Sequence, residues 1–357
     1  MKINKKTECK EFRSYFRFIG QVKQTITGTS ENFKVHPLFQ STITKTNKPR
    51  RVLQFDVLTN KFNNCKVELA GMQKDFVYLF SSTEKKSQQI KWDDRLDKTK
   101  YPNNTYHYIQ VEWDLSQEIA NTLNIDDWVE VKGKYQFDKF VNEEGKEYSV
   151  IKRIITSVEQ IEDGQEIALR NKTKIKYVTD FDSPDFVEVN YFGLEVGIKS
   201  VYQDEETKDV IVNGVFLDYG KEKSTPRDVK LSVPYKEASK GKTSLADAFA
   251  KLNEYDFLDV VGIDNNRPVF TEVEVEASED DAFADVEETV AQTQRVISGN
   301  KKGLEIIAVV KNSLQKGLLT QEEFEPTVEQ TFSGNEVNND DEVPFSDADM
   351  PDWLKED

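Results

Sequence analysis

The fold is decided by a stretch that the chain contains twice: Leu123-Asn124-Ile125-Asp126-Asp127-Trp128-Val129-Glu130-Val131-Lys132-Gly133 and Leu252-Asn253-Glu254-Tyr255-Asp256-Phe257-Leu258-Asp259-Val260-Val261-Gly262. Both copies read Leu-Asn-x-x-Asp, then an aromatic residue, an aliphatic residue, an acid and Val-x-Gly. Each follows a short segment with a helical pattern, at 115–123 and 244–252. Because the copies recur in the same surroundings, we interpret them as two diverged copies of one domain.

The elements around the two copies come in a similar order, with strands before the helix and strands after it. In the first half, strands are predicted at 14–27, 51–58, 65–69, 75–80, 106–113, 127–135 and 148–158, with an irregular insertion at 81–105. In the second half, they are predicted at 192–202, 209–219, 229–233, 256–262 and 268–276. Three strands, a helix and two strands are the order of an OB-fold, a small five-stranded barrel. We therefore expect a mainly β fold with tandem OB-fold barrels, followed by an acidic, largely disordered C-terminal tail with a short helical segment.

The charge divides the 357-residue chain into unlike parts, although its net charge is −17. Residues 1–160 carry 27 Lys/Arg and 21 Asp/Glu, a net of +6, whereas residues 277–357 carry 6 and 20, a net of −14. By subtraction, −17 + 14 − 6 leaves −9 for residues 161–276. The basic front is suited to hold phosphates, and an acidic tail is suited to compete for the same surface.

These boundaries predict five regions. They are a basic OB-fold at 1–161 that is the proposed domain for single-stranded DNA, an acidic OB-like domain at 162–276, a mobile linker at 277–300, a short helical segment at 301–326 and an acidic partner-docking tail at 327–357. The linker is acidic and poor in aromatic residues. The helical segment rests on Leu304, Ile307, Ala308 and Leu314, which fall roughly on one helical face.

Catalytic and cofactor motifs are weak in this sequence. It holds two histidines, His36 and His107, which are too few for most histidine-based catalysis. Gly241-Lys242-Thr243 imitates the end of a phosphate loop, but Lys236 stands where that motif requires its earlier glycine. Asp204-Glu205-Glu206 is interpreted as a solvated turn. We expect a protein that is not an enzyme and that has no cofactor and no metal site.

The cysteines and the N-terminus predict the compartment. Two cysteines, Cys9 and Cys65, give no disulfide framework, which favours a reducing, cytoplasmic setting. The basic N-terminus has no apolar run behind it, so a signal peptide is not expected. No stretch is long enough to cross a membrane.

Single-stranded DNA is held by cations that follow the phosphates and by flat side chains that lie under the bases. The first domain has both kinds of residue. The candidates are Tyr15, Arg17, Lys48, Arg50, Arg51, Phe55, Tyr78, Trp92, Tyr106, Tyr108, Lys132, Lys134, Lys139, Lys152 and Arg153.

Several of these candidates have an alternative structural interpretation. In the strand at 14–27, we place Phe16 and Phe18 inside and Tyr15 and Arg17 outside. Phe55 fits the core and the surface equally well, and the face of Tyr106 and Tyr108 stays open. Trp92 lies in a charged loop, where an exposed ring for stacking is as plausible as a buried one. The basic turn at 45–51 suits a phosphate contact or a merely solvated loop.

The C-terminal tail contains Asp340-Asp341-Glu342-Val343-Pro344-Phe345 and, after it, Trp353. Acidic residues followed by an aliphatic-Pro-Phe step resemble the C-terminal tip of bacterial single-stranded DNA-binding proteins. The resemblance implies that these seven residues bind partner proteins, with Phe345 or Trp353 as the anchor. It departs from the family because there the Phe ends the chain, whereas twelve residues follow Phe345 here.

The resemblance and the residues together predict a protein that binds and protects single-stranded DNA during replication, recombination or repair. Its partners would be single-stranded DNA and, through the tail, replication or recombination proteins, and the chain looks like a bacteriophage or mobile-element type that acts in the bacterial cytoplasm. Two alternatives remain, a structural or assembly protein that uses OB barrels for protein contacts, and an RNA-binding OB protein. The sequence leaves a homo-oligomer open.

Overall fold

The computed structural model describes residues 11–28, 33–44, 47–141, 147–218, 224–274 and 293–321. Strands dominate these ranges, which also hold two α-helices, α1 (Glu112–Thr122) and α2 (Leu245–Phe249). The mainly β fold that the sequence predicts is therefore confirmed. The expected disordered tail, including Asp340 to Phe345 and Trp353, lies outside the described residues.

The first half of the chain closes a circuit of five strands. These are β1 (Ser14–Lys23), β5 (Pro49–Leu58), β6 (Asn64–Met72), β10 (Trp128–Val141) and β11 (Glu147–Gln160). β1 pairs with β5, β5 with β6, β11 with β10 and β10 with β1, all antiparallel, while β6 and β11 are parallel. The helix α1 lies between the third and fourth strands in the sequence and packs beside β5 and β6.

The second half repeats this circuit with five later strands. These are β14 (Val189–Gln203), β15 (Val210–Asp218), β16 (Thr225–Val233), β17 (Phe257–Glu274) and β18 (Thr293–Val309). Four of its strand pairings are again antiparallel, and the pairing of the third strand, β16, with the fifth, β18, is parallel. The helix α2 again lies between strands three and four, and the Ser244 hydroxyl caps it by accepting the Asp247 amide at 3.0 Å.

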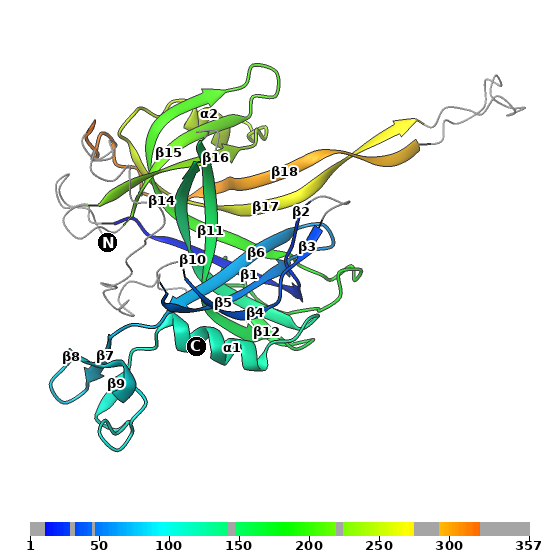
Figure 1. Cartoon of the computed structure of the whole chain (residues 1–357). Helices are drawn as coiled ribbons and strands as arrows, with labels where there is room; N and C mark the ends of the chain where they lie inside the picture. Colours follow the sequence, from blue (N-terminus) through cyan, green and yellow to red (C-terminus); the bar gives the residue numbers. More distant parts are fainter. Residues whose placement is uncertain are drawn as a thin grey trace, which may run out of the picture.

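The first strands of the two circuits, β1 and β14, pair antiparallel and join both circuits into one eleven-stranded sheet. In Figure 1 the second circuit lies above the first, and this seam runs between them. Phe16 of β1 stands opposite Phe192 of β14, and both rings are buried. Because one apolar cluster contains residues of both circuits, the two halves share a continuous core.

The repeated stretch forms the same turn in both halves, before β10 and before β17. The Asn124 amide donates to Asp127 Oδ2 at 2.8 Å, and the Asn253 amide donates to Asp256 Oδ2 at 3.0 Å. The residue before each of these aspartates, Asp126 or Tyr255, has a φ of +71°. The two copies of the stretch therefore form the same turn, with the same hydrogen bond and the same φ.

The glycine that ends each copy lies at a bulge and under a ring. The strand register shifts at Gly133 in β10 and at Gly262 in β17. A Cβ at Gly133 would lie 2.1 Å from the Ile154 carbonyl oxygen and 2.4 Å from Phe16 Cζ. At Gly262 it would lie 2.0 Å from the carbonyl oxygen of Glu305 and 2.3 Å from the Phe192 ring. Only glycine fits at these two positions.

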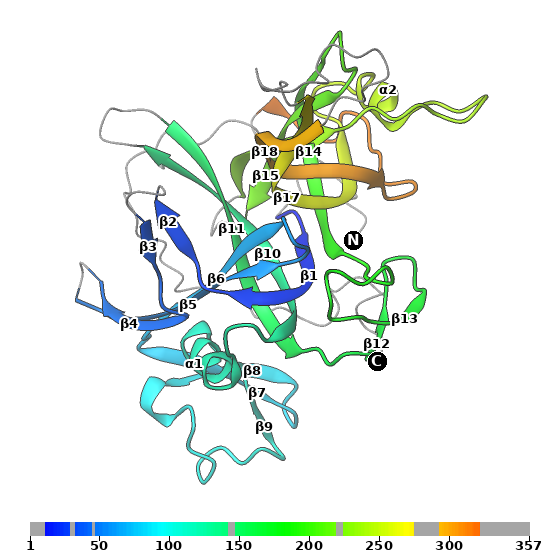
Figure 2. The same cartoon turned by 90° about the vertical axis from the view of Figure 1, so that its right-hand side faces the viewer.

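The insertion of the first half is a small domain of its own. It holds β7 (Phe76–Ser81), the 3-10 helix η2 (Trp92–Asp94), β8 (Lys86–Lys91) and β9 (Tyr106–Tyr108), with the sheet order β8-β7-β9. Figures 1 and 2 show this cyan sheet projecting from the barrel beside α1. The prediction that 75–80 and 106–113 are barrel strands is wrong, because their buried residues form a separate apolar cluster.

The end of the second barrel also differs from the prediction. The segments predicted as separate strands at 256–262 and 268–276 are one strand, β17, and the fifth strand is β18. β18 occupies part of the predicted linker (277–300) and of the predicted helical segment (301–326). Leu304 and Ile306 are two residues apart and both belong to the apolar core, which is the spacing of one face of a strand. The second barrel therefore extends beyond residue 276.

The remaining strands are short. β2 (Ile26–Gly28) and β3 (Phe33–Val35) form a hairpin between β1 and β5, followed by β4 (Phe39–Ile43), which pairs with β5. β12 (Glu166–Ala168) and β13 (Lys174–Lys176) form a second hairpin in the connection between the barrels. The hairpin of β17 and β18 forms a long arm that reaches away from the barrels in Figure 1.

Candidate nucleic-acid interface

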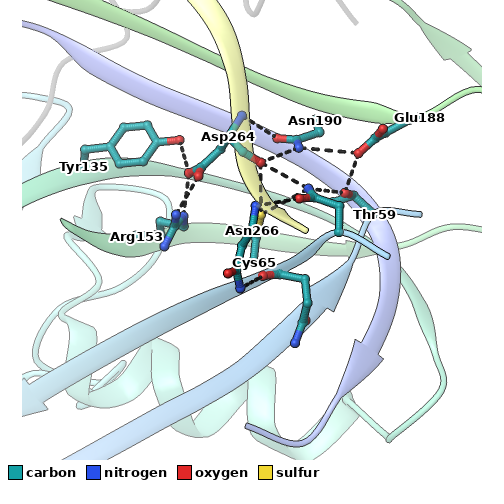
Figure 3. A network of polar contacts seen from close by, with 10 residues as sticks. Thr59, Cys65, Tyr135, Arg153, Glu188, Asn190, Asp264 and Asn266 are labelled. Carbon is teal, nitrogen blue, oxygen red and sulfur yellow. Dashed lines mark hydrogen bonds and ion pairs between the residues drawn. The ribbon is translucent and has the colours of Figure 1, made fainter. Parts of the chain in front are cut away.

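Arg153, one of the predicted DNA contacts, lies instead in a buried polar network between the barrels (Figure 3). Its guanidinium donates two hydrogen bonds of 2.6 Å to the carboxylate of Asp264, whose side chain is fully buried. The Tyr135 hydroxyl donates to the same carboxylate at 2.9 Å. Asn63 and Asn190 donate their side-chain amides to the Asp264 carbonyl oxygen at 3.1 and 2.7 Å. This network fixes the first barrel to β17 of the second.

Burial and charge in this network set the protonation of its members. Burial disfavours the charged guanidinium, but the Asp264 carboxylate outweighs it and raises the pKa of Arg153. Burial, followed by the Asp264 charge, raises the pKa of the Cys65 thiol and of the Tyr135 hydroxyl. Arg153 therefore keeps its charge beside Asp264 and is not available to a phosphate.

Two further predicted contacts belong to the interior of the first half. Arg17 was predicted to face outward, but it is buried. Its guanidinium donates to Glu130 at 2.5 Å and forms an internal ion pair. Phe55 is fully buried in the barrel core, which settles its open interpretation. Phe16 and Phe18 point inward as predicted.

The aromatic candidates around the insertion mostly face its small core. Trp92 is buried, and the Arg95 guanidinium lies 4.0 Å from its ring centroid. Tyr106 and Tyr108 share the inner face of the inserted sheet, and the Tyr108 hydroxyl donates to Asp114 at 2.7 Å. Arg51 is half-buried, with its guanidinium 4.2 Å from the ring centroid of Trp113. These four predicted residues thus serve packing in this structure.

Tyr15 lies at the seam between the barrels. It is half-buried and stands opposite Gly193, where an added Cβ would meet its ring at 2.0 Å. Burial, followed by the negative charge of Asp259, raises the pKa of Tyr15 to about 12. The ring is therefore held by the seam rather than offered to a base.

The predicted lysines of β10 and β11 lie at the surface but have acidic neighbours. Lys132 is 2.9 Å from Glu130, Lys152 is 2.7 Å from Asp138, and Lys139 is 2.8 Å from Asp228 of the second barrel. Lys134 is half-exposed on the same strand. A phosphate at Lys132, Lys139 or Lys152 would have to compete with a carboxylate.

Two predicted cations lie at the turn from β4 to β5 and the start of β5. Lys48 and Arg50 are both exposed there. The β2–β3 hairpin, in the same connection between β1 and β5, carries Phe33, which is 60% exposed, and Lys34, which is also exposed. Phe33 and Lys34 were not among the residues predicted from the sequence. The signal for them was an aromatic residue beside a lysine in a segment too short for a sustained apolar alternation, which is typical of an exposed hairpin.

A second group that the sequence reasoning missed lies on β7 of the inserted sheet. Phe76 and Phe80 are 49% and 37% exposed, and the predicted Tyr78 between them is half-exposed. The strand reads Phe-Val-Tyr-Leu-Phe, with large apolar residues on both faces. A small sheet with a single covered face cannot bury the apolar residues of both faces. The run of large apolar residues without alternation was therefore the sequence signal for an exposed aromatic face.

A pocket between the first barrel and the connection at 179–182 has the wrong charge for phosphates. It measures about 540 Å3 and is lined by Leu58, Phe62, Trp128 and Phe181 together with Gln21, Lys61, Thr179, Asp180 and Asp182. Lys61, its one cation, is already paired with Asp182. Two carboxylates therefore face the pocket against one neutralised ammonium group.

Neither a metal cluster nor a membrane-spanning helix occurs in the part of the chain that the structure describes. The described residues contain no group of three or more His, Cys, Asp or Glu side chains placed to hold a metal ion. They also contain no helix that is long and apolar enough to cross a membrane.

The protein therefore belongs to the class of β proteins with two closed five-stranded circuits. The circuits share one seam, and a small sheet is inserted in the first of them. A sequence profile of the YorF family matches residues 72–342, and the chain belongs to this family. The family name states no activity. No curated protein matches the sequence.

Solved structures of a single-stranded DNA-binding protein from Thermus aquaticus resemble the chain weakly. The wild-type protein aligns at 10% identity and a TM-score of 0.38, over 84% of this chain and 93% of that one. A deletion mutant of it aligns at 10% identity and a TM-score of 0.36, over 84% and 94%. At this level, the likeness says nothing about what the present chain binds.

Proposed function

We propose that both circuits are OB-folds and that the protein binds and protects single-stranded DNA through the first of them. The observation that carries the proposal is the strand order 1-2-3-5-4-1 of the first circuit, combined with the exposed residues Phe33, Lys34, Lys48 and Arg50 in the segment that runs from its first strand into its second. An OB-fold binds oligonucleotides across strands two and three and the loop after strand one. In this chain, that loop is the segment from β2 to β4.

The proposed mechanism combines two contacts of different kinds. Lys34, Lys48 and Arg50 neutralise phosphates, which gives affinity without sequence preference and makes binding depend on salt. Phe33 offers a ring on which a base stacks, at about 1–3 kcal/mol per base. A strand held in this way is kept from annealing and from nucleases, which fits a role in replication or recombination.

The tail has a separate role in the proposal. Residues 322–357 carry 13 Asp/Glu and one Lys, a net of −12. Such a segment is attracted to basic pockets on partner proteins, where an aromatic anchor such as Phe345 or Trp353 fixes it. The second barrel, with its acidic neighbourhood, acts as the support that joins the DNA-binding barrel to this tail.

The experiment that tests the proposal is the anisotropy of labelled oligo(dT) titrated with the full chain at low and high salt. Matched duplex DNA and oligo(U) serve as competitors. We expect saturable binding to oligo(dT) that weakens with salt and that the duplex competes for poorly. No binding at low salt would refute the proposal and favour an assembly protein, while tighter binding of oligo(U) would favour the RNA-binding alternative.

A further inference from the structure

The inserted sheet presents a face that its own core does not use. In β7, Val77 and Leu79 point to the inner face and are each 1% exposed. Phe76, Tyr78 and Phe80 alternate with them and therefore share the outer face. Phe76 and Phe80 are 49% and 37% exposed.

The neighbouring strands complete this face with a histidine and a lysine. His107 of β9 stands opposite Phe80, and their rings are nearly parallel, at 27° with centroids 6.5 Å apart. Lys91 of β8 is exposed and stands opposite Phe76, at the other end of β7. We call the four rings, Phe76, Tyr78, Phe80 and His107, the aromatic row.

Folding of the insertion does not explain the aromatic row. The inner face already packs Val77, Leu79, Ile90 and Trp92 into one cluster. Large rings left in a line on the other face lose the benefit of burial. An exposed row of this kind indicates a binding surface.

We propose that the aromatic row is a second contact surface for single-stranded DNA, distinct from the first barrel; the inference rests on the proposed function. The charge around the row favours a polyanion, since residues 73–111 carry seven Lys/Arg and five Asp/Glu, a net of +2. A protein partner with an apolar face would not need Lys91 at the end of the row.

A basic passage connects the row to the first barrel. A small pocket of about 170 Å3 lies between the β4–β5 turn and the start of β7, and its charged lining residues are Lys48, Lys74 and Asp75, a net of +1. The Gln73 amide donates to the Pro49 carbonyl oxygen at 3.2 Å, which holds the insertion against that turn. A strand that leaves Lys48 and Arg50 therefore meets Lys74 and then Phe76.

The spacing between the rings of β7 matches the bases of an extended single strand rather than the stacked bases of a duplex. Alternate residues of a strand are about 6.8 Å apart, twice the ~3.4 Å spacing of stacked bases. Each ring of β7 therefore takes one base of an extended strand. The barrel and the row together lengthen the stretch of DNA that one chain covers.

The test compares the Phe76→Ala/Phe80→Ala double variant with the full wild-type chain on labelled oligo(dT). We expect binding of a long oligonucleotide of about 30 bases to weaken at least about tenfold, and binding of a short one of about 8 bases to stay within about twofold. Lys91→Ala lowers the slope of log K against log salt by about 0.7. Leu96→Ala, at a residue of the same insertion that is 56% exposed, is the matched control and leaves both affinities unchanged.

The outcomes separate this inference from the proposed function. If wild type binds both oligonucleotides and the double variant equals it at each length, the row is no DNA surface and the inference is overturned while the barrel site stands. If wild type binds neither, the proposed function fails and the inference falls with it. Phe76, Phe80 and Leu96 lie at the surface, so we expect both variants to fold, and melting curves of the double variant and of Leu96→Ala check this.

Discussion

At the scale of single residues, the positions that look most ready for a ligand serve the structure. Arg17 and Arg153 lie on strands of a basic domain, where a phosphate contact is expected. Each instead forms a buried ion pair with a carboxylate. Trp92 stands in a charged loop and is nevertheless covered by Arg95. A long cationic side chain leaves the surface when a carboxylate from a distant strand is presented to it, and this partner is invisible in the local sequence.

Asp264→Asn is expected to destabilise the protein by about 3–5 kcal/mol, because it leaves the Arg153 cation buried without its partner. Urea unfolding measures the loss. Replacing both residues, as Asp264→Asn with Arg153→Met, is expected to recover part of it. Lys174→Met, which breaks an exposed pair with Glu166, is the control and costs at most about 1 kcal/mol. Equal losses for the two single variants would contradict the assignment of a buried pair.

Gly133→Ala is expected to destabilise by about 1–3 kcal/mol or more, because its Cβ would lie 2.1 Å from a backbone oxygen. The same holds at Gly262, which occupies the equivalent bulge. Gly299→Ala is the control, since an added Cβ there meets nothing within 4 Å. Thermal melting of the three variants checks this, and a Gly133→Ala chain as stable as Gly299→Ala would refute it.

Asp259 predicts a pH dependence of stability. Burial, followed by the charge of Glu195, raises the pKa of Asp259 from 3.8 to about 6. Between these values the folded state binds more protons than the unfolded state, so this residue makes stability fall as pH rises from about 4 to about 6. Asp259→Asn is expected to remove that fall. The measurement is the difference in unfolding free energy between variant and wild type across this range, with the exposed Asp185→Asn as control.

At the scale of elements, the loops between strands decide where a ligand meets the first barrel. β2, β3 and β4 rise from the loop between the first and second strands, and β4 covers one edge of β5. The insertion rises from the connection between the third strand and α1. The basic turn before β5 ends the first addition and lies against the start of the second.

Lys48→Ala/Arg50→Ala is expected to reduce the slope of log K against log salt for oligo(dT) by about 1.4, because two phosphate contacts are lost at about 0.7 each. The stability of the variant should stay near that of wild type, since both side chains are exposed. Lys230→Ala on β16, an exposed lysine of the second barrel, is the matched control. An unchanged slope for the double variant would place the phosphate contacts elsewhere.

At the scale of the whole molecule, the two barrels are joined into one unit. The net charge of the chain is positive in its first half and negative towards its C-terminus. The two barrels share the β1–β14 seam, one core and the Asp264 network. The residues beyond 321 hold −12 of the total charge of −17, so the rest of the chain carries −5. Most of the charge that opposes DNA binding therefore lies beyond the second barrel.

A truncated chain that ends at Gln321 is expected to bind oligo(dT) more tightly at low salt than the full chain, with the difference shrinking at high salt. A truncation at Ser278 is unsuitable, because it removes β18 and leaves the second barrel open. Anisotropy titrations at two salt concentrations measure the effect. Equal affinities at low salt would refute the competition between tail and DNA.

The local turns and the duplication could be predicted from the sequence alone. The L-N-x-x-D stretch specifies its hydrogen bonds within four residues, and its glycines mark both bulges, so two copies predict two similar units. Alternation placed Phe16 and Phe18 inside for the same local reason. The mainly β class followed from these patterns.

Only the tertiary structure decided which strands close each barrel and which charged residues stay exposed. β18 reads as a helical face in isolation and becomes a strand because β17 and β16 offer it open edges on both sides. Strands at 75–80 and 106–108 look like barrel strands but join a separate sheet, because their apolar sides find a nearer core. Arg17 and Arg153 are withdrawn by carboxylates 113 and 111 residues away. Pairing over such separations depends on the closed fold and not on the neighbouring sequence.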